Sequence, residues 1–368
     1  IDAPAGGDGA AGGGGVLIAL HGEWDVGGRT WPAGSLLAFD LEAYLTGARR
    51  AHPLFTPDDT MFLQGFTATR HHLVLDVTVD VVPGLRVATP PVRGDEEWAV
   101  HPLDLAGTAV PAFASVSAGA VSPLEDDRLW LTVSGFTTPT TLLLAELDAD
   151  GRLATSLVVR RAPALFDTTG VEVAQHFATS LDGTRVPYFQ VGRPTDASAG
   201  AMGGDAVGGA PTLLYGYGGF EVSLLPAYSA TVGRAWLERG GTYVVANIRG
   251  GGEYGPAWHR AALRRKRHRA YEDFEAVARD LVARGVTTPA HLGIQGGSNG
   301  GLLTGNMLVR TPELFGAVVI QVPLLDMRRY HTLLAGSSWM SEYGDPDDPD
   351  QWQWLRGFSP FHLLDRTR

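Results

Sequence analysis

The stretch Gly-Gly-Ser-Asn-Gly-Gly at residues 296–301 constrains the fold more than any other part of the chain. An apolar run over 291–295 leads into it, and a helical pattern over 302–310 follows it. A serine in a tight glycine turn between a strand and a helix is the G-x-S-x-G arrangement of an exposed nucleophile. The flanking glycines are needed because a Cβ atom would collide in so sharp a turn, and the serine is expected at strained backbone angles.

Two interpretations of this turn remain open. Ser298 is either a nucleophile, with the backbone N–H of Asn299 beside it to hold an oxyanion, or part of a plain glycine-rich turn. A second oxyanion donor is expected in Tyr215–Phe220, after a predicted strand at 212–215. A backbone N–H of that segment or the Tyr217 hydroxyl can serve there, whereas the plainer alternative is a glycine turn with aromatic packing.

Strands and helices alternate from Thr212 onward, which predicts a mostly parallel sheet with helices on both faces. A Gly-, Ala- and Ser-rich loop at 193–210 precedes this part, and a hairpin over 177–190 precedes the loop. The glycines at 250–252 are expected to let the backbone pass close to the site. The expected strands are 212–215, 242–248, the run into Ser298 and 317–322, and the expected helices are 229–239, 271–284 and 302–310.

Residues 1–165 have a different character and are predicted to be all-β. Short apolar runs recur between turn signals, at a spacing that suits small antiparallel sheets in a sandwich or in propeller blades. The pattern alone leaves both architectures open. The expected domains are therefore 1–165 and 166–368, and the clearest strands of the first are 16–20, 35–39, 72–77, 129–133 and 141–146.

Composition narrows the possible functions. The chain has no cysteine, which excludes thiolate chemistry, and a net charge of −11 argues against a nucleic-acid partner. No apolar run approaches the ~20 residues of a membrane span, so no membrane partner is expected. The basic run at 264–269 is interpreted as a solvated loop, and no metal or cofactor site is predicted, because His71-His72 lacks a third ligand nearby.

Several motifs together resemble the prolyl oligopeptidase family of serine peptidases. They are Tyr215–Phe220, residues 246–255 with Trp258-His259, residues 296–303 and Tyr343-Gly-Asp-Pro346, in matching order and spacing. The resemblance is strong over 172–365 and weaker over 1–165. It implies a partial β-propeller of late blades at 1–165 and an α/β-hydrolase domain at 166–368, truncated at its C-terminus.

The resemblance also implies roles for individual residues. Ser298 is the expected nucleophile, and the Asn299 N–H and the Tyr217 hydroxyl are expected to stabilise the oxyanion. A proline ring of the substrate is expected to stack on Trp339. The same pocket is expected to be lined by Phe220, Val322 and Tyr343. An aromatic box suits proline, a compact apolar ring without an N–H.

The acid and base of the triad are expected outside this chain. In the family they follow the serine in the order Asp, His, beyond the stretch that matches Ser359–His362. Asp326 is a conceivable stand-in acid, and His331 and His362 are the only later histidines, but all three are interpreted as structural. Since a serine without a base is a weak nucleophile, the 368-residue chain is expected to be nearly inactive by itself.

The expected activity is cleavage of short peptides on the carboxyl side of proline through an acyl-enzyme. The alternatives are another oligopeptidase, such as a basic-residue or acylaminoacyl peptidase, an esterase of the same fold, or a non-catalytic scaffold if the gene ends near Arg368. The expected partner is an oligopeptide substrate, and the protein is expected to be a monomer. The compartment is expected to be cytoplasmic. Ile1 and Arg368 suggest cut ends, so a signal peptide could have been lost, and the periplasm stays open as the alternative.

Overall fold

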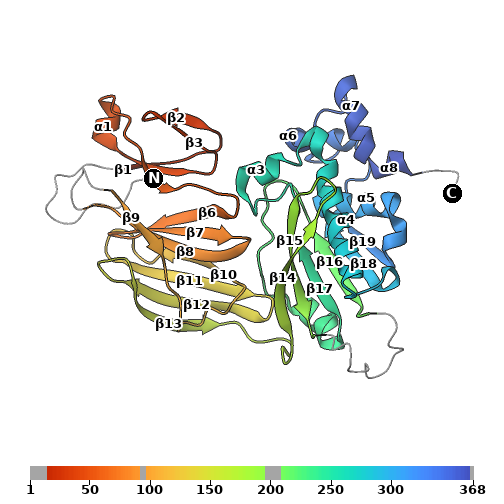
Figure 1. The fold of residues 1–368 in the computed structure, drawn as a ribbon, viewed down its shortest axis with the longest axis horizontal. Helices are drawn as coiled ribbons and strands as arrows, with labels where there is room; N and C mark the ends of the chain where they lie inside the picture. The colour runs from red at the N-terminus through yellow and green to blue at the C-terminus, as the bar shows by residue number, and fades with distance from the viewer. Residues whose placement is uncertain (1–14, 92–96, 195–208, 365–368) are drawn as a thin grey trace. The chain divides into compact units, whose positions relative to one another are not determined.

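The structure is a computed structural model that describes residues 15–91, 97–194 and 209–364 (Figure 1). The chain divides into two compact units. Unit 1 runs to Ala164 and also takes in residues 225–228 and 254–256, and the rest of the chain forms unit 2. The boundary expected at 165 lies beside this division, and the loop expected at 193–210 falls largely outside the described residues.

Unit 1 is built from antiparallel strands, as predicted. Its sheets have the orders β1-β4-β5, β2-β3, β6-β7-β8-β9 and β10-β11-β12-β13. Its grouping into propeller blades stays a prediction. The elements are β1 (Gly15–Ala19), β2 (Trp24–Val26), β3 (Arg29–Trp31), β4 (Leu36–Asp40), α1 (Leu41–Leu45), β5 (His52–Phe55), β6 (Met61–Ala68), β7 (Leu73–Val79), β8 (Val82–Thr89), β9 (Ala99–Pro102), β10 (Ala114–Ala120), β11 (Arg128–Gly135), β12 (Thr138–Leu147) and β13 (Leu153–Arg161).

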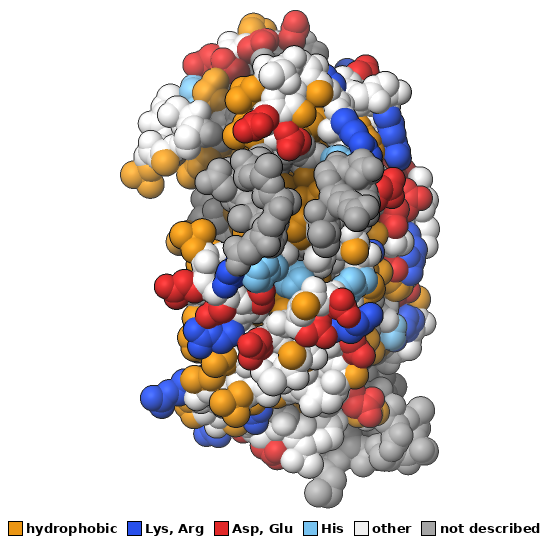
Figure 2. Space-filling model, turned by 90° about the vertical axis from the view of Figure 1, so that its left-hand side faces the viewer, with side chains coloured by type: hydrophobic (Ala, Val, Ile, Leu, Met, Phe, Trp, Pro, Cys, Tyr) orange, Lys and Arg blue, Asp and Glu red, His pale blue; other side chains and the backbone are white. Residues whose placement is uncertain are grey.

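Alternation along the strands of unit 1 produces hydrophobic layers on the two faces of a sheet. On β7, Val74 belongs to a core shared with β10–β12, whereas Leu75 and Val77 pack with β4 and β5 residues in a second core. Acidic and basic side chains are interspersed on the face shown in Figure 2.

Unit 2 contains a six-stranded sheet in the order β14-β15-β17-β16-β18-β19. The first two pairings are antiparallel and the others are parallel. The strands are β14 (Glu172–Thr179), β15 (Arg185–Gly192), β16 (Thr212–Gly216), β17 (Thr242–Ala246), β18 (Leu292–Gly297) and β19 (Ala317–Gln321). The helices are α2 (Ala230–Ala235), α3 (Gly255–Arg260), α4 (His268–Ala283), α5 (Asn299–Arg310), α6 (Met340–Tyr343), α7 (Pro349–Leu355) and α8 (Pro360–Leu363).

One face of this sheet is fully buried beneath α4 and α5. Leu214 of β16 and Ile294 of β18 have no exposed surface and share a core with Phe274 of α4 and Leu303 of α5. On the opposite face, Tyr215 and Gln295 are half-buried and Val319 is exposed. The described helices therefore cover one face of these strands completely and the other only in part, where the sequence predicts cover on both.

The helix predicted over 229–239 is broken in two. Helix α2 ends at Ala235, and a short 3-10 turn over Leu237–Arg239 follows. The break falls at Trp236, whose indole N–H reaches forward to donate to the carbonyl of Thr242 at 2.8 Å. The predicted left-handed cap is confirmed at Gly240, which has a φ of 85°.

Candidate active site

The predicted site residues follow two neighbouring parallel strands. Tyr217 comes directly after β16, and Ser298 comes directly after β18. The strands pair with Tyr215 opposite Gln295, so their carboxyl ends meet at the same edge of the sheet. The chain places β17 on one side of β16 and β18 on the other, and such a switch point opens the crevice in which α/β proteins bind ligands.

The strand–turn–helix context predicted for Ser298 is confirmed. Ser298 has a φ of 56° and a ψ of −116°, its side chain is exposed, and Asn299 begins α5. A Cβ atom on Gly296 would collide with the carbonyl oxygen of Gly300, and one on Gly301 would lie 2.6 Å from that of Gln321. The glycines therefore allow a turn that holds the hydroxyl outward at strained backbone angles.

The half-buried Tyr217 side chain reaches the serine. Burial raises the pKa of the Tyr217 phenol above its usual value, against the lowering effects of the nearby Ser298 side chain and of the Arg267 charge. A phenol that stays protonated remains a hydrogen-bond donor at neutral pH.

The Asn299 side chain ties the two strand ends together. Its Nδ2 donates to the carbonyl of Tyr217 at 2.5 Å, and its Oδ1 accepts from the Tyr343 hydroxyl at 2.8 Å and from the Arg267 guanidinium. The residue is fully buried. The sequence predicts a role only for its backbone N–H and carries no signal for this second role.

The interpretation of 264–269 as a solvated loop is wrong, because residues 264–266 form a 3-10 turn, α4 begins at His268, and Arg267 between them is buried. Arg267 precedes α4 and is 1% exposed. Its guanidinium donates to Glu342 Oε1 at 3.0 Å as well as to Asn299. The inward turn of Arg267 depends on a carboxylate 75 residues away, which a local charge pattern does not reveal.

Glu342 connects Arg267 to the loop after Tyr217. Its Oε1 also accepts from the backbone N–H of Phe220 at 3.0 Å, and its Oε2 lies 2.7 Å from Nε2 of His259. Burial acts to raise the pKa of Glu342, but the His259 hydrogen bond and the Arg267 charge outweigh it, and the pKa falls below its usual value. The Arg267–Glu342 contact is therefore a buried ion pair with several partners.

The four predicted pocket residues lie in different surroundings. Phe220 is half-buried and meets Tyr343 edge-on, with ring centroids 5.6 Å apart. Tyr343 has no exposed surface, so it supports Phe220 from behind instead of facing open space. Trp339 packs half-buried against the same core, and Val322, two residues before Leu324, is 80% exposed. Contacts of Trp339 and Val322 with a substrate stay predictions.

The glycine-rich segment after β17 approaches the site, as predicted. A Cβ atom on Gly250 would collide with the carbonyl oxygen of Gly218, in the loop that carries Tyr217. Arg249 anchors this segment, because its guanidinium donates to the buried Asp273 at 2.6 Å and to Asp182 at 2.6 Å. Only glycine therefore fits where the two loops pass.

Each of the late residues Asp326, His331 and His362 contacts a neighbouring polar side chain. Asp326 accepts from Arg329 Nε at 2.6 Å, and His362 Nδ1 lies 2.8 Å from the Ser359 hydroxyl. His331 Nε2 lies 2.9 Å from a carboxylate oxygen of Asp347. These contacts favour the structural interpretation of all three residues.

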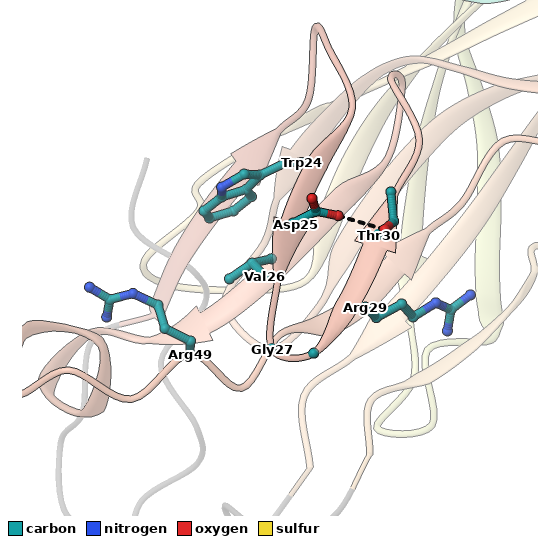
Figure 3. A pocket seen from close by; sticks show the side chains of 8 residues that line it. Trp24, Asp25, Val26, Gly27, Arg29, Thr30 and Arg49 are labelled. Carbon is teal, nitrogen blue, oxygen red and sulfur yellow. Dashed lines mark hydrogen bonds between the residues drawn. The ribbon is translucent and has the colours of Figure 1, made fainter.

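A cavity of about 500 Å³ lies elsewhere, at the β2–β3 hairpin of unit 1 (Figure 3). The Asp25 carboxylate there accepts from the Thr30 hydroxyl at 2.5 Å. The Arg29 and Arg49 side chains point away from each other, each over an aromatic ring outside the cavity lining. The polar groups do not converge on one point, so this cavity lacks the arrangement of a binding site.

Two searches of the described residues were negative. Within residues 15–91, 97–194 and 209–364, no three His, Asp or Glu side chains are grouped so that they could hold a metal ion. No helix in these ranges has both the length and the apolar character needed to cross a bilayer.

Comparison with known proteins identifies relatives that match a large part of the chain. Residues 228–367 match the family described as the prolyl oligopeptidase family. An uncharacterized peptidase of Sinorhizobium fredii is 42% identical over 350 residues, which are 94% of this chain and 45% of the relative. A prolyl endopeptidase of Elizabethkingia meningoseptica is 34% identical over 271 residues, 72% of this chain and 36% of the relative.

A solved structure is similar across both units. A post-proline cleaving enzyme from Rickettsia typhi matches 95% of this chain and 48% of its own, with a TM-score of 0.81 and 33% identity. The chain thus spans about half the length of the proteins that it matches over nearly its whole length.

Proposed function

The chain belongs to the prolyl oligopeptidase family, and on that premise we propose that the natural protein is a serine endopeptidase that cleaves short peptides after proline. The observation that supports this most is the placement of Tyr217 and the exposed Ser298 directly after two paired parallel strands. It brings a nucleophile and an oxyanion donor together at the carboxyl ends of β16 and β18.

The proposed reaction proceeds in two acyl-transfer steps. Ser298 Oγ attacks the carbonyl carbon on the carboxyl side of proline, and its proton passes to a general base. The Tyr217 hydroxyl and the Asn299 N–H stabilise the resulting oxyanion, which collapses as the C–N bond breaks and the amine leaves with that proton. Water then attacks the acyl-enzyme in the same way, and this releases the peptide acid and restores Ser298.

The general base is proposed to come from outside the stretch 1–368. The later histidines of this chain, His331 and His362, are held by Asp347 and Ser359. We therefore expect residues 1–368 alone to react slowly, whereas the natural protein, expressed from its complete gene, reacts at the full rate.

Substrate preference is proposed to rest on apolar contact with the proline ring. Phe220 is backed by the buried Tyr343, and the half-buried Trp339 packs on the same core. Replacing Trp339 with alanine is expected to raise KM for a proline substrate by an amount that corresponds to about 1–3 kcal/mol of lost apolar contact.

The nucleophile is tested with a fluorophosphonate probe on the natural protein. Wild type should become labelled and Ser298→Ala should not, whereas Ser338→Ala, at an exposed serine of the same unit, should label like wild type. Equal labelling of wild type and Ser298→Ala would reject the assignment.

The substrate class is tested with paired reporter peptides. We expect faster turnover of a Gly-Pro reporter than of a Gly-Arg reporter, because the proposed pocket is apolar. The opposite order would favour a basic-residue oligopeptidase, and turnover of simple esters alone would favour an esterase.

A further inference from the structure

Arg267 is a buried cation that joins two loops of the proposed active site. Burial of an ion costs free energy unless other groups pair with it. Here Glu342 supplies the counter-charge, and Asn299, the residue after Ser298, accepts a hydrogen bond from the guanidinium. The Arg267 side chain thus contacts Asn299, whose backbone N–H is one proposed oxyanion donor, and Glu342, which binds the loop that carries the other, Tyr217.

The loop after β16 is clamped from two directions. The Asn299 side chain holds the carbonyl of Tyr217, and Glu342 holds the N–H of Phe220. Gly219 lies between these contacts, where a Cβ atom would come within 2.8 Å of Arg267 Nη2 and 2.6 Å of Asn299 Nδ2. Little freedom is therefore left to residues 217–220 while Arg267 and Glu342 stay paired.

The clamped loop carries backbone strain. Phe220 has a φ of 55° and Glu221 a φ of 56°, left-handed values that are unfavourable for residues with a Cβ atom. Such strain persists where surrounding contacts determine the conformation. The hydrogen bond from Phe220 N to Glu342 is one contact of this kind, and the His259 hydrogen bond and the Arg267 charge keep that carboxylate ionised by lowering its pKa.

We propose that Arg267, with Glu342 as its counter-ion, is a positioning residue that holds the Tyr217 hydroxyl and the Asn299 N–H at the spacing required by the oxyanion. It acts through the Asn299 side chain and does not touch the substrate. The inference rests on the proposed function, since it assigns the two donors to one tetrahedral intermediate.

Kinetics of the natural protein test the inference. Arg267→Met should lower kcat for a proline reporter by about 10²-fold with little change in KM, because displaced donors weaken transition-state binding alone. A peptide aldehyde, which forms a tetrahedral adduct, should lose affinity by a similar factor, and the product peptide should not. Arg267→Lys should restore little, since one ammonium cannot reach both partners as a planar guanidinium does.

Controls separate positioning from loss of folding. Arg267→Met leaves Glu342 buried without its counter-ion, so the double variant Arg267→Met, Glu342→Gln provides a neutral pair. It should melt nearer to the wild-type temperature but keep the kcat defect. Arg284→Met is the control, because Arg284 donates to the hydroxyl of the buried Tyr188 but lies outside the proposed site. It should leave kcat unchanged.

A readout without turnover keeps the inference distinct from the proposed function. With 3-fluorotyrosine at position 217, ¹⁹F NMR follows the titration of this phenol, which faces Ser298, Arg267, Glu342 and Tyr215. Arg267→Met should raise its pKa and Glu342→Gln should lower it. Shifts of the Tyr217 pKa with opposite signs in the two variants support the placement of the ion pair beside Tyr217.

The outcomes divide as follows. If only wild type is labelled by the fluorophosphonate but Arg267→Met keeps kcat and aldehyde affinity, the positioning role is overturned and the proposed function stands. If Ser298-dependent labelling is absent, the proposed function fails, and the ¹⁹F titration alone decides: opposite shifts support the placement, and unchanged titration overturns it.

Discussion

Glu253 gives unit 2 a pH-dependent stability that can be measured directly. The carboxyl group is buried, and its Oε1 accepts from the N–H of Leu224 at 2.9 Å and from Nδ2 of Asn247 at 3.3 Å. Burial raises the pKa of Glu253 from 4.5 to about 7, against the lowering effect of these hydrogen bonds. The folded protein therefore keeps this group protonated at pH values where the unfolded chain has released the proton.

The sign and size of the effect follow from this difference. Because the folded-state pKa is the higher one, its contribution to stability is fully present below the unfolded pKa and is lost as the pH rises through about 7. One pKa unit corresponds to about 1.4 kcal/mol, so full ionisation costs about 3.5 kcal/mol. Between about pH 5 and about pH 8, the loss is about 2.5 kcal/mol.

Glu253→Gln tests this reasoning because the amide oxygen can still accept both hydrogen bonds but cannot ionise. Thermal melts at a series of pH values should show wild type losing roughly 5–10 °C relative to the variant between about pH 5 and about pH 8. Glu313→Gln, at an exposed carboxylate of the same unit, should leave the pH dependence as in wild type. If the melting temperatures of wild type and Glu253→Gln change with pH in the same way, the raised pKa assigned to Glu253 is refuted.

Three further variants test other contacts. Tyr217→Phe should lower kcat on a proline reporter by about 10²-fold with KM unchanged, because one oxyanion donor is lost; an unchanged kcat would exclude this role. Gly216→Ala places a Cβ atom 2.6 Å from the buried Phe274 ring and should destabilise the protein by roughly 1–3 kcal/mol in thermal melts. Gly293→Ala should be tolerated, because the nearest atom to its new Cβ lies 3.8 Å away. Arg249→Met leaves Asp273 buried without its cation and should cost about 3–5 kcal/mol in melts, and adding Asp273→Asn should recover part of it.

The sequence predicted the elements that local patterns determine. Buried strands such as β16 and β18 appear as apolar runs, and the glycine turn marks the point where β18 meets α5. The sequence also predicted an oxyanion donor after the strand at 212–215, and the pairing of β16 with β18 places Tyr217 and Ser298 after neighbouring strand ends. The predicted helix over 229–239 is too long, because the Trp236 indole bonds to Thr242 across the turn, and no local sequence pattern indicates this contact.

The supporting side chains of the site could not be predicted in this way. Arg267 stands in a run of basic residues that looks solvated, and its burial depends on Glu342, far along the chain. Likewise, the Asn299 amide bonds to the Tyr217 carbonyl only after β16 and β18 have paired. Such roles depend on distant partners, whereas a turn or a strand carries its signal in neighbouring residues.

The pairing of β16 with β18 has a consequence for how the protein tolerates change. Leu213 faces Gly293, and Tyr215 faces Gln295, through bonds between main chains that stand ~4.8 Å apart. Replacing a side chain does not change this main-chain pairing or its spacing. Deleting a single residue from β16 or β18 would shift the oxyanion donor that follows that strand, Tyr217 or Asn299, by ~3.3 Å along the strand. It would also turn the side chains of that strand to the opposite face of the sheet. Variation between homologues should therefore appear here as replacements, and length changes should be confined to the loops.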